Sequence, residues 1–207
     1  MHIPVTDTVN INVLTFDDAL GEYEAYTGGE FSAEDWLYVP PRYSEYRYIL
    51  GTKGNNPLIC IGINPSTAVP NDLDNTLKSV ERIAKHNGFD SFIMFNVYAE
   101  RATVPSDMDR ECNPHLHQEN MKAFRYVLEK SKSPALWAAW GAIIEERAYL
   151  ADCVSDMINI AIEFDARWYT SGKISKKGHP HHPLYLKKDS PLDVFDVRTY
   201  VSSVLAK

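Results

Sequence analysis

The sequence predicts an α/β fold, a three-layer sandwich in which helices cover both faces of a central four-stranded, mainly parallel sheet. Short apolar runs alternate along the chain with segments of helical periodicity, and turn residues stand between them. Strands that are apolar throughout are typical of a parallel sheet buried on both faces. With 207 residues, of which 44% are hydrophobic, the chain can fill the core of one such domain.

Four apolar runs account for the predicted strands. They cover residues 58–63, 92–98, 135–140 and 160–169. Each run has the length of a strand and falls well short of the roughly 20 apolar residues that a membrane-spanning helix needs. We therefore expect a soluble protein with no membrane partner.

Helical segments follow these runs. Asp74 is a good N-cap for a helix that Asn87-Gly88 would end, and Asn113-Pro114 offers a cap with proline at the first helical position of a second helix. A third helix is predicted after Gly141 through about Met157, and a closing helix over 192–205.

Residues 1–41 differ in composition from the main domain, which we place at 42–207. They carry eight acidic side chains and no Lys or Arg, which leaves 20 acidic and 21 basic side chains for the rest. A short β-like piece over 11–16 and an aromatic segment over 36–38 precede Pro40-Pro41. These features predict an acidic N-terminal extension, whose role the composition does not indicate.

The start of the chain and its cysteines bear on the compartment. The first residues lack a basic region followed by an apolar run and a cleavage site, so no secretion signal is expected. Three widely spaced cysteines fit neither a disulfide framework nor a metal knuckle, and we interpret them as reduced thiols. A cytoplasmic protein is the resulting expectation, and the oligomeric state stays open.

Ligands of parallel α/β sheets bind outside the carboxyl ends of the strands, so the residues that follow the predicted strands are candidate site residues. Asn64-Pro65-Ser66-Thr67 follows the first strand, where an amide and hydroxyls can position a water or meet an anion, or can simply cap a helix. Asn96 closes the second strand and can read the edge of a heterocycle, or can bond neighbouring backbone. Arg101 can hold a phosphate or carboxylate, or form a surface ion pair, and Thr103 follows it.

The segment Gly178-His179-Pro180-His181-His182-Pro183 combines three histidines with two prolines that restrict the backbone. A histidine held in this way can donate to a developing oxyanion or act as an acid or base near neutral pH. No Cys or carboxylate spacing supports a metal site, and neither a phosphate-binding nor a dinucleotide glycine motif is present. We therefore expect no metal and no organic cofactor.

Basic side chains gather around this segment. Residues 167–188 contain six of them and no acidic residue. The pattern indicates either a local surface that faces an anion or a solvated, lysine-rich loop.

Several blocks of the chain resemble a bacterial and phage family known as domain of unknown function 1643. They are Tyr46-Arg47-Tyr48, Ile61 to Ala68, Asn96 with Arg101-Ala102-Thr103, Ala139-Trp140-Gly141, and Gly178 to Leu186. This resemblance spans residues 46–188. The family label implies no activity.

The order of the same blocks is more distantly similar to the uracil-DNA glycosylase superfamily. Gly62-Ile63-Asn64-Pro65 resembles the water-activating motif of the mismatch-specific branch, Phe95-Asn96-Val97 the strand whose Asn reads the base, and Trp140-Gly141 the end of the third strand. The His-Pro segment falls where those enzymes stabilise the departing base. Either His179 or His182 can be aligned with the anion-stabilising histidine.

The resemblance implies a uracil-DNA glycosylase-like fold and a set of site residues. Asn64, His179 and His182 are the candidate catalytic residues. Gly62, Ile63, Pro65, Ser66, Thr67, Asn96, Arg101, Thr103, Trp140, Gly141, His181 and Tyr185 are the candidate substrate-binding residues.

The function expected from these residues is hydrolysis of an N-glycosidic bond in DNA or in a nucleotide-like molecule, with the base flipped out of its stack where the substrate is DNA. Two alternatives remain. The protein can be a non-catalytic binder of a nucleotide or modified base with the same pocket, or a hydrolase of a free nucleoside.

Overall fold

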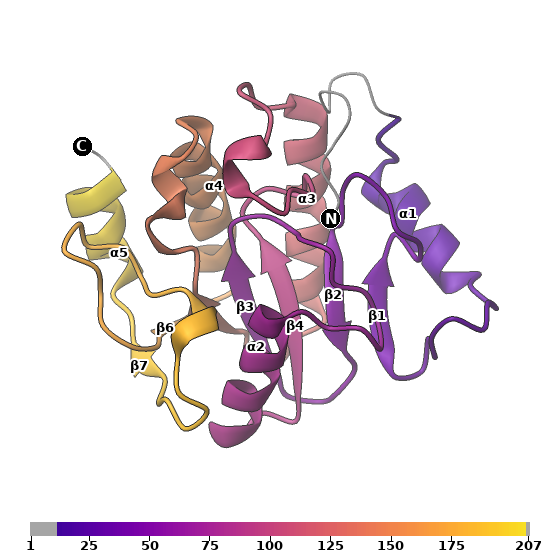
Figure 1. Ribbon diagram of the computed structural model, residues 1–207, viewed down its shortest axis with the longest axis horizontal. Coiled ribbons are helices and arrows are strands. Elements are labelled where there is room, and N and C mark those ends of the chain that lie inside the picture. The colour runs from indigo at the N-terminus through magenta and orange to yellow at the C-terminus, as the bar shows by residue number, and fades with distance from the viewer. Residues whose placement is uncertain (1–11, 206–207) are drawn as a thin grey trace.

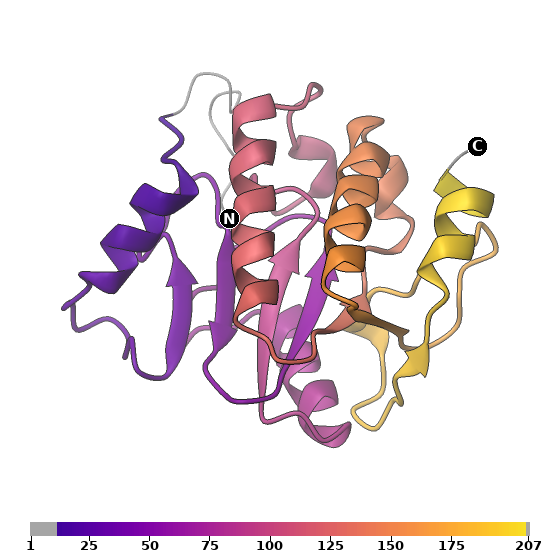
Figure 2. The same ribbon diagram turned by 180° about the vertical axis from the view of Figure 1, so that it is seen from behind.

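A seven-stranded sheet runs through the middle of the protein, and helices lie on both of its faces (Figures 1 and 2). The computed structural model describes residues 12–205. The helix α2 (Asn75–His86) covers one face, whereas α3 (Pro114–Glu129) and α4 (Tyr149–Glu163) lie side by side on the other. The predicted α/β class is therefore confirmed.

The sheet is larger than predicted and mixed in direction. Its strands are β1 (Trp36–Val39), β2 (Ile49–Thr52), β3 (Pro57–Gly62), β4 (Ser91–Asn96), β5 (Ala135–Ala138), β6 (Arg167–Thr170) and β7 (Asp193–Val194). In the order β1-β2-β4-β3-β5-β6-β7, the middle four strands β4, β3, β5 and β6 are mutually parallel, and β1, β2 and β7 are added antiparallel. The expectation of a four-stranded sheet is therefore wrong, although its four strands correspond to the parallel centre.

Two of the predicted segments change at their ends. The predicted strand over 160–169 begins as helix, because α4 continues to Glu163, and Asp165 with a φ of 49° separates it from β6. Ile160, Ala161 and Phe164 extend the buried face of α4, whereas Ile162 is exposed. The predicted closing helix over 192–205 is split into β7, a short α5 (Val197–Tyr200) and a π-helical turn over 201–205.

The helices that follow β3 and β4 begin where the sequence indicates. Asp74 caps α2 by accepting a hydrogen bond of 2.9 Å from the backbone N–H of Leu77, and the helix ends at Asn87 and Gly88. Asn113 caps α3, with proline at its first position. These caps satisfy backbone donors that a helix start otherwise leaves without partners.

The N-terminal residues add to the same sheet and core. Phe16–Glu24 form α1, and residues 12–15 form no strand, so the β-like piece predicted over 11–16 is wrong for residues 12–16. Ile11 lies outside the residues that the structure describes. The buried Glu119 on α3 accepts a hydrogen bond of 2.7 Å from the backbone N–H of Phe16. The aromatic segment over 36–38 belongs to the edge strand β1. The domain boundary at residue 41 stays a prediction.

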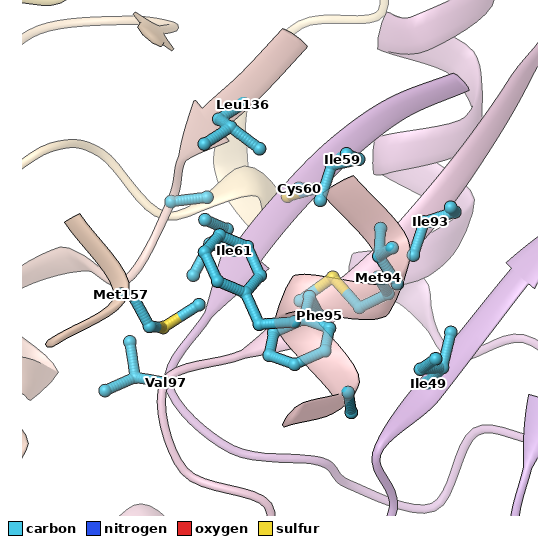
Figure 3. Close-up of a cluster of buried hydrophobic side chains, with 14 of the residues drawn as sticks. Ile49, Ile59, Cys60, Ile61, Ile93, Met94, Phe95, Val97, Leu136 and Met157 are labelled. Carbon is cyan, nitrogen blue, oxygen red and sulfur yellow. The ribbon is translucent and has the colours of Figure 1, made fainter. Parts of the chain in front are cut away.

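Side chains along the central strands alternate between the two helical layers. Phe95 of β4 contacts Phe124 of α3 at 5.1 Å between ring centroids, so the neighbouring Met94 and Asn96 point to the face that α2 covers. Figure 3 shows how side chains from β2, β3, β4, β5 and α4 converge around Phe95 and Met94. This alternation places Asn96 on the side of the sheet where the candidate site lies.

The connections around β3 leave an opening at its carboxyl end. The chain passes from β3 to its neighbour β4 through α2, and from β4 to β5 through α3 on the opposite face. The chain thus leaves β3 toward the neighbour on one side and later returns to β5, the neighbour on the other side. Ligands of parallel α/β sheets bind at the point where the order of the strands reverses in this way. None of the helices within residues 12–205 is long and apolar enough to cross a lipid bilayer.

Candidate functional site

A cavity of about 290 Å³ lies at this opening. The residues after β3, β4 and β5, the first turn of α2 and the histidine-containing loop before residue 185 line it. Asn64, Asn96 and His182 are among the lining residues, although they lie far apart in the sequence. The fold therefore brings an amide from each of two strand ends and an imidazole from late in the chain to one cavity.

Asn64 is fixed through its amide nitrogen. The Nδ2 group donates to the carbonyl of Ala102 at 2.8 Å and to that of Pro65 at 3.0 Å. Both bonds use the nitrogen, which leaves the amide oxygen as an acceptor for a water molecule or a ligand. The loop after β4 thus orients the asparagine that follows β3.

Asn96 ends β4 directly opposite Gly62, its partner in the parallel register. Its side chain is only 1% exposed, and neither Nδ2 nor Oδ1 has a hydrogen-bond partner within residues 12–205. A Cβ atom on Gly62 would lie 3.3 Å from Oδ1 and 2.5 Å from the end of Met94. A glycine at this position therefore keeps the space in front of the amide open.

His182 reaches the cavity from a loop that α2 holds in place. Ser79 of α2 donates to the carbonyl of Pro183 at 2.9 Å, and the N–H of Leu184 donates to Nδ1 of His182 at 3.3 Å. A neutral ring that accepts at Nδ1 carries its proton on Nε2. Burial lowers the pKa of His182, and the nearby His181 lowers it further, while Asp74 raises it. The imidazole is therefore a neutral donor at neutral pH.

His179 lies outside the cavity in a structural network. Trp140 Nε1 donates to the hydroxyl of Tyr200 at 2.9 Å, and that hydroxyl lies 2.9 Å from Nδ1 of His179. Its Nε2 atom lies 3.1 Å from a carboxylate oxygen of Glu145. Burial raises the pKa of Tyr200 to about 12, so its hydroxyl stays protonated and donates to the ring. Both nitrogens of His179 thus have partners away from Asn64 and Asn96.

The structure divides the remaining predicted residues into two groups. Those that line the cavity with Asn64 and His182 are Gly62, Ile63, Ser66, Asn96 and Thr103. Those that do not line it are Pro65, Thr67, Arg101, Trp140, Gly141, His179, His181 and Tyr185.

Of the second group, Gly141 lies next to His182 behind the cavity wall, whereas His181 and Tyr185 have other surroundings. Gly141, with a φ of 64°, adopts the left-handed conformation that glycine tolerates, and a Cβ atom there would lie 3.5 Å from that of His182. His181 packs against Gly172, where a Cβ atom would approach its ring to 2.9 Å. Tyr185 is largely exposed.

Arg47 and Asp74 line the cavity and were not among the predicted site residues. The sequence assigned Asp74 only to helix capping, which is confirmed, and gave no role to Arg47. Arg47 precedes the antiparallel strand β2, so an argument from the ends of parallel strands does not reach it. The signal available in the sequence was its position between two aromatic residues in the block Tyr46-Arg47-Tyr48, and the structure shows both tyrosines buried.

Two other observations concern alternative sites, namely a second hollow and a possible metal site. A larger hollow of about 520 Å³ lies along residues 106–111 with Arg147, but this arginine already donates to the carbonyls of Met108 and Asp109. Within residues 12–205, no group of three or more His, Cys, Asp or Glu side chains is arranged to hold a metal ion.

The fold and the cavity together define an α/β protein with a polar pocket at the carboxyl ends of its parallel strands. Among protein families, the chain belongs to the one described as Protein of unknown function (DUF1643), whose model matches residues 47–184. All the residues that line the cavity lie within this range, from Arg47 to Leu184. No curated protein and no solved structure matches the chain.

Proposed function

We propose that the protein hydrolyses an N-glycosidic bond in DNA or in a nucleotide-like molecule, at the cavity that holds Asn64, Asn96 and His182. The observation that carries the proposal is the buried amide of Asn96, which has both a donor and an acceptor without partners and lies in the same cavity as the other two side chains. A buried amide in this state is suited to a ligand edge that offers both a donor and an acceptor, as the bases do.

The three side chains fit one hydrolytic step. The free oxygen of Asn64 holds a water molecule, whose oxygen forms a bond to the anomeric carbon, while the bond from that carbon to the base nitrogen breaks and leaves its electron pair on the base. Nε2–H of His182 donates to the resulting anion, and the proton of the water passes to solvent. A donor fixed in advance stabilises charge as it develops. The order of the strand-end blocks, similar to that in uracil-DNA glycosylases, supports these roles.

The test measures release of free base from oligonucleotides, nucleotides and nucleosides that carry uracil or modified pyrimidines. Abasic sites are detected by alkaline cleavage and free bases by chromatography. We expect Asn64→Ala and His182→Ala to slow release about 100-fold each, a typical loss for one donor or positioning group. Thr67→Ala is the control, because Thr67 lies in the same loop but is exposed and does not line the cavity. If the wild-type protein releases no base from any substrate, hydrolysis is refuted.

A second candidate function is non-catalytic binding of a nucleotide or modified base. The favouring observation is that Asp74, the sole carboxylate among the described residues that line the cavity, already uses Oδ1 to cap α2, so only Oδ2 is left to activate a water. Calorimetry separates the two functions. Binding without turnover that survives in His182→Ala, but not in Asn96→Ala, identifies a binding protein.

A further inference from the structure

Two arginines lie buried next to each other beside the cavity. Arg47 is 1% exposed and lines the cavity, and Arg101 is fully buried behind it. Both donate to the carbonyl of Ala68, and Arg101 also donates to the carbonyl of Ser66 and, at 3.2 Å, to the hydroxyl of Tyr38. The guanidinium carbon of Arg101 lies over the ring of Tyr43, 4.3 Å from its centroid. Two like charges are thus held inside the protein by neutral groups.

Neither arginine forms an ion pair with a carboxylate among residues 12–205. The Nε atom of Arg47 has no hydrogen-bond partner in the part of the chain that the structure describes. Burial, and next the charge of Arg101, lower the pKa of Arg47 to about 9. Asp74 acts on Arg47 only at longer range, and one of its oxygens already caps α2. Buried charges are normally paired, so an unpaired guanidinium at a cavity wall indicates a missing anion.

We propose that Arg47 binds a phosphate group of the ligand, so that the cavity receives a nucleotide and not a nucleoside or free base. The identification of the ligand as a nucleotide rests on the proposed function, in which Asn96 binds the base. Asn96 lines the same cavity, and its Nδ2 and Oδ1 atoms also have no hydrogen-bond partner within residues 12–205. A guanidinium offers several fixed N–H donors that match phosphate oxygens, and Arg101 behind it adds charge without entering the cavity. The phosphate belongs either to a free nucleotide or to the backbone of DNA.

The first measurement is binding to the wild-type protein, without any need for turnover. Inorganic phosphate, a panel of pyrimidine nucleosides, their 5′-monophosphates and short single strands with the same bases are titrated by calorimetry and by thermal unfolding. We expect phosphate, but not chloride at equal ionic strength, to raise the unfolding temperature. We also expect a monophosphate or a strand to bind at least about tenfold more tightly than its nucleoside, a typical gain for one good charge-assisted contact.

Substitutions then assign this preference to Arg47. Arg47→Met is expected to remove the response to phosphate and to bring the affinity ratio of nucleotide to nucleoside close to one. Arg47→Lys, which keeps the charge in case the methionine variant does not fold, is expected to reduce the ratio without abolishing it. Arg82→Met is the matched control, because Arg82 is an exposed arginine on α2 outside the cavity.

The outcomes separate this proposal from the hydrolase. Equal affinities of nucleosides, nucleotides and strands for the wild-type protein, together with no response to phosphate, overturn the anion site. So does an undiminished phosphate response in both Arg47 variants. A phosphate response that depends on Arg47 without release of any base leaves the anion site standing and removes the hydrolytic function. Tight monophosphate binding identifies a free nucleotide, and preference for the strand identifies DNA.

Discussion

The buried amide of Asn96, which has no hydrogen-bond partner within residues 12–205, is expected to lower the free energy of unfolding. A buried polar group without a partner destabilises a fold by about 1–3 kcal/mol, whereas an apolar side chain of similar shape does not. We predict that Asn96→Leu unfolds at the same urea concentration as the wild type or a higher one, while ligand binding is lost. A large loss of stability would show that the amide is satisfied within the protein and is not reserved for a ligand.

Asn120 provides the contrast for that measurement. It lies on α3, is equally buried, and donates from Nδ2 to the backbone carbonyls of Asn96 and Val97. Replacing Asn120 with leucine leaves those two carbonyls without the hydrogen bonds from its amide. Asn120→Leu should therefore lower the free energy of unfolding by about 1–3 kcal/mol. The Oδ1 atom of Asn120 has no partner within residues 12–205, so the two asparagines differ in the Nδ2 group, which is bonded in Asn120 and without a partner in Asn96.

His182 predicts a pH dependence of stability. Its pKa is lowered in the folded protein, chiefly by burial, so the unfolded chain binds the proton more tightly. The contribution of His182 to the free energy of unfolding is present above the usual histidine pKa of about 6.5 and is lost as the pH falls below that value. We predict that His182→Gln flattens the decline in stability between about pH 7 and pH 5, as measured by urea unfolding. The same change at the exposed His86 should leave the wild-type slope unaltered.

At the level of elements, Asp74 links the start of α2 to the cavity. Its carboxylate caps the helix, and the residue also lines the cavity. Asp74→Ala should lower the free energy of unfolding by about 1 kcal/mol, a typical cost of losing an N-cap, whereas Asp74→Asn should preserve it because asparagine caps equally well. Urea unfolding of both variants checks this. A similar loss in both would mean that the charge of Asp74, and not its hydrogen bond to Leu77, stabilises the helix.

The elements that the sequence predicted well are those with strong local signals. The parallel strands β3, β4 and β5 coincide with uninterrupted apolar runs, and α2 and α3 begin at recognisable caps. The strands β1, β2 and β7 were missed, because they are short and lie toward the edges of the sheet in antiparallel pairs. Their pairing depends on distant partners that local periodicity does not reveal.

The candidate site was predictable for a related reason. Asn64 and Asn96 are polar residues that directly follow apolar strands, so a general rule about parallel sheets points to them. The choice between His179 and His182 was open in the sequence, and it is the network around Tyr200 that directs His179 away from the cavity. Arg47 was missed as a site residue because its position depends on β2, which the sequence did not predict.

At the level of the whole molecule, the N-terminal segment is connected to the arginines beside the cavity. Tyr38 of β1 accepts a hydrogen bond from Arg101, and burial raises the pKa of this tyrosine even though both arginines lower it. Its hydroxyl also donates to the carbonyl of Arg42. Tyr38 of the acidic segment thus contacts Arg101 as a neutral group, and none of the acidic side chains within residues 12–41 forms an ion pair with Arg47 or Arg101.

Removal of residues 1–41 tests whether 42–207 is an independent unit. Within its described part, the deletion takes away α1, β1 and eight buried residues, namely Phe16, Ala19, Tyr23, Phe31, Tyr38, Val39, Pro40 and Pro41. It also uncovers β2 as an unpaired strand edge, which favours aggregation. Loss of that much burial costs several kcal/mol against a typical total of about 5–15 kcal/mol. We predict that the 42–207 fragment unfolds at a much lower temperature or aggregates, as followed by circular dichroism and size-exclusion chromatography. Glu119→Gln, which weakens the attachment of α1 together with the ion pair to Lys122 on the same helix, is expected to give a smaller loss in the same direction. A fragment that is monomeric and as stable as the full chain would instead show that the segment is a separate appendage, and that the buried positions of Phe16 and Tyr38 contribute nothing to the main core.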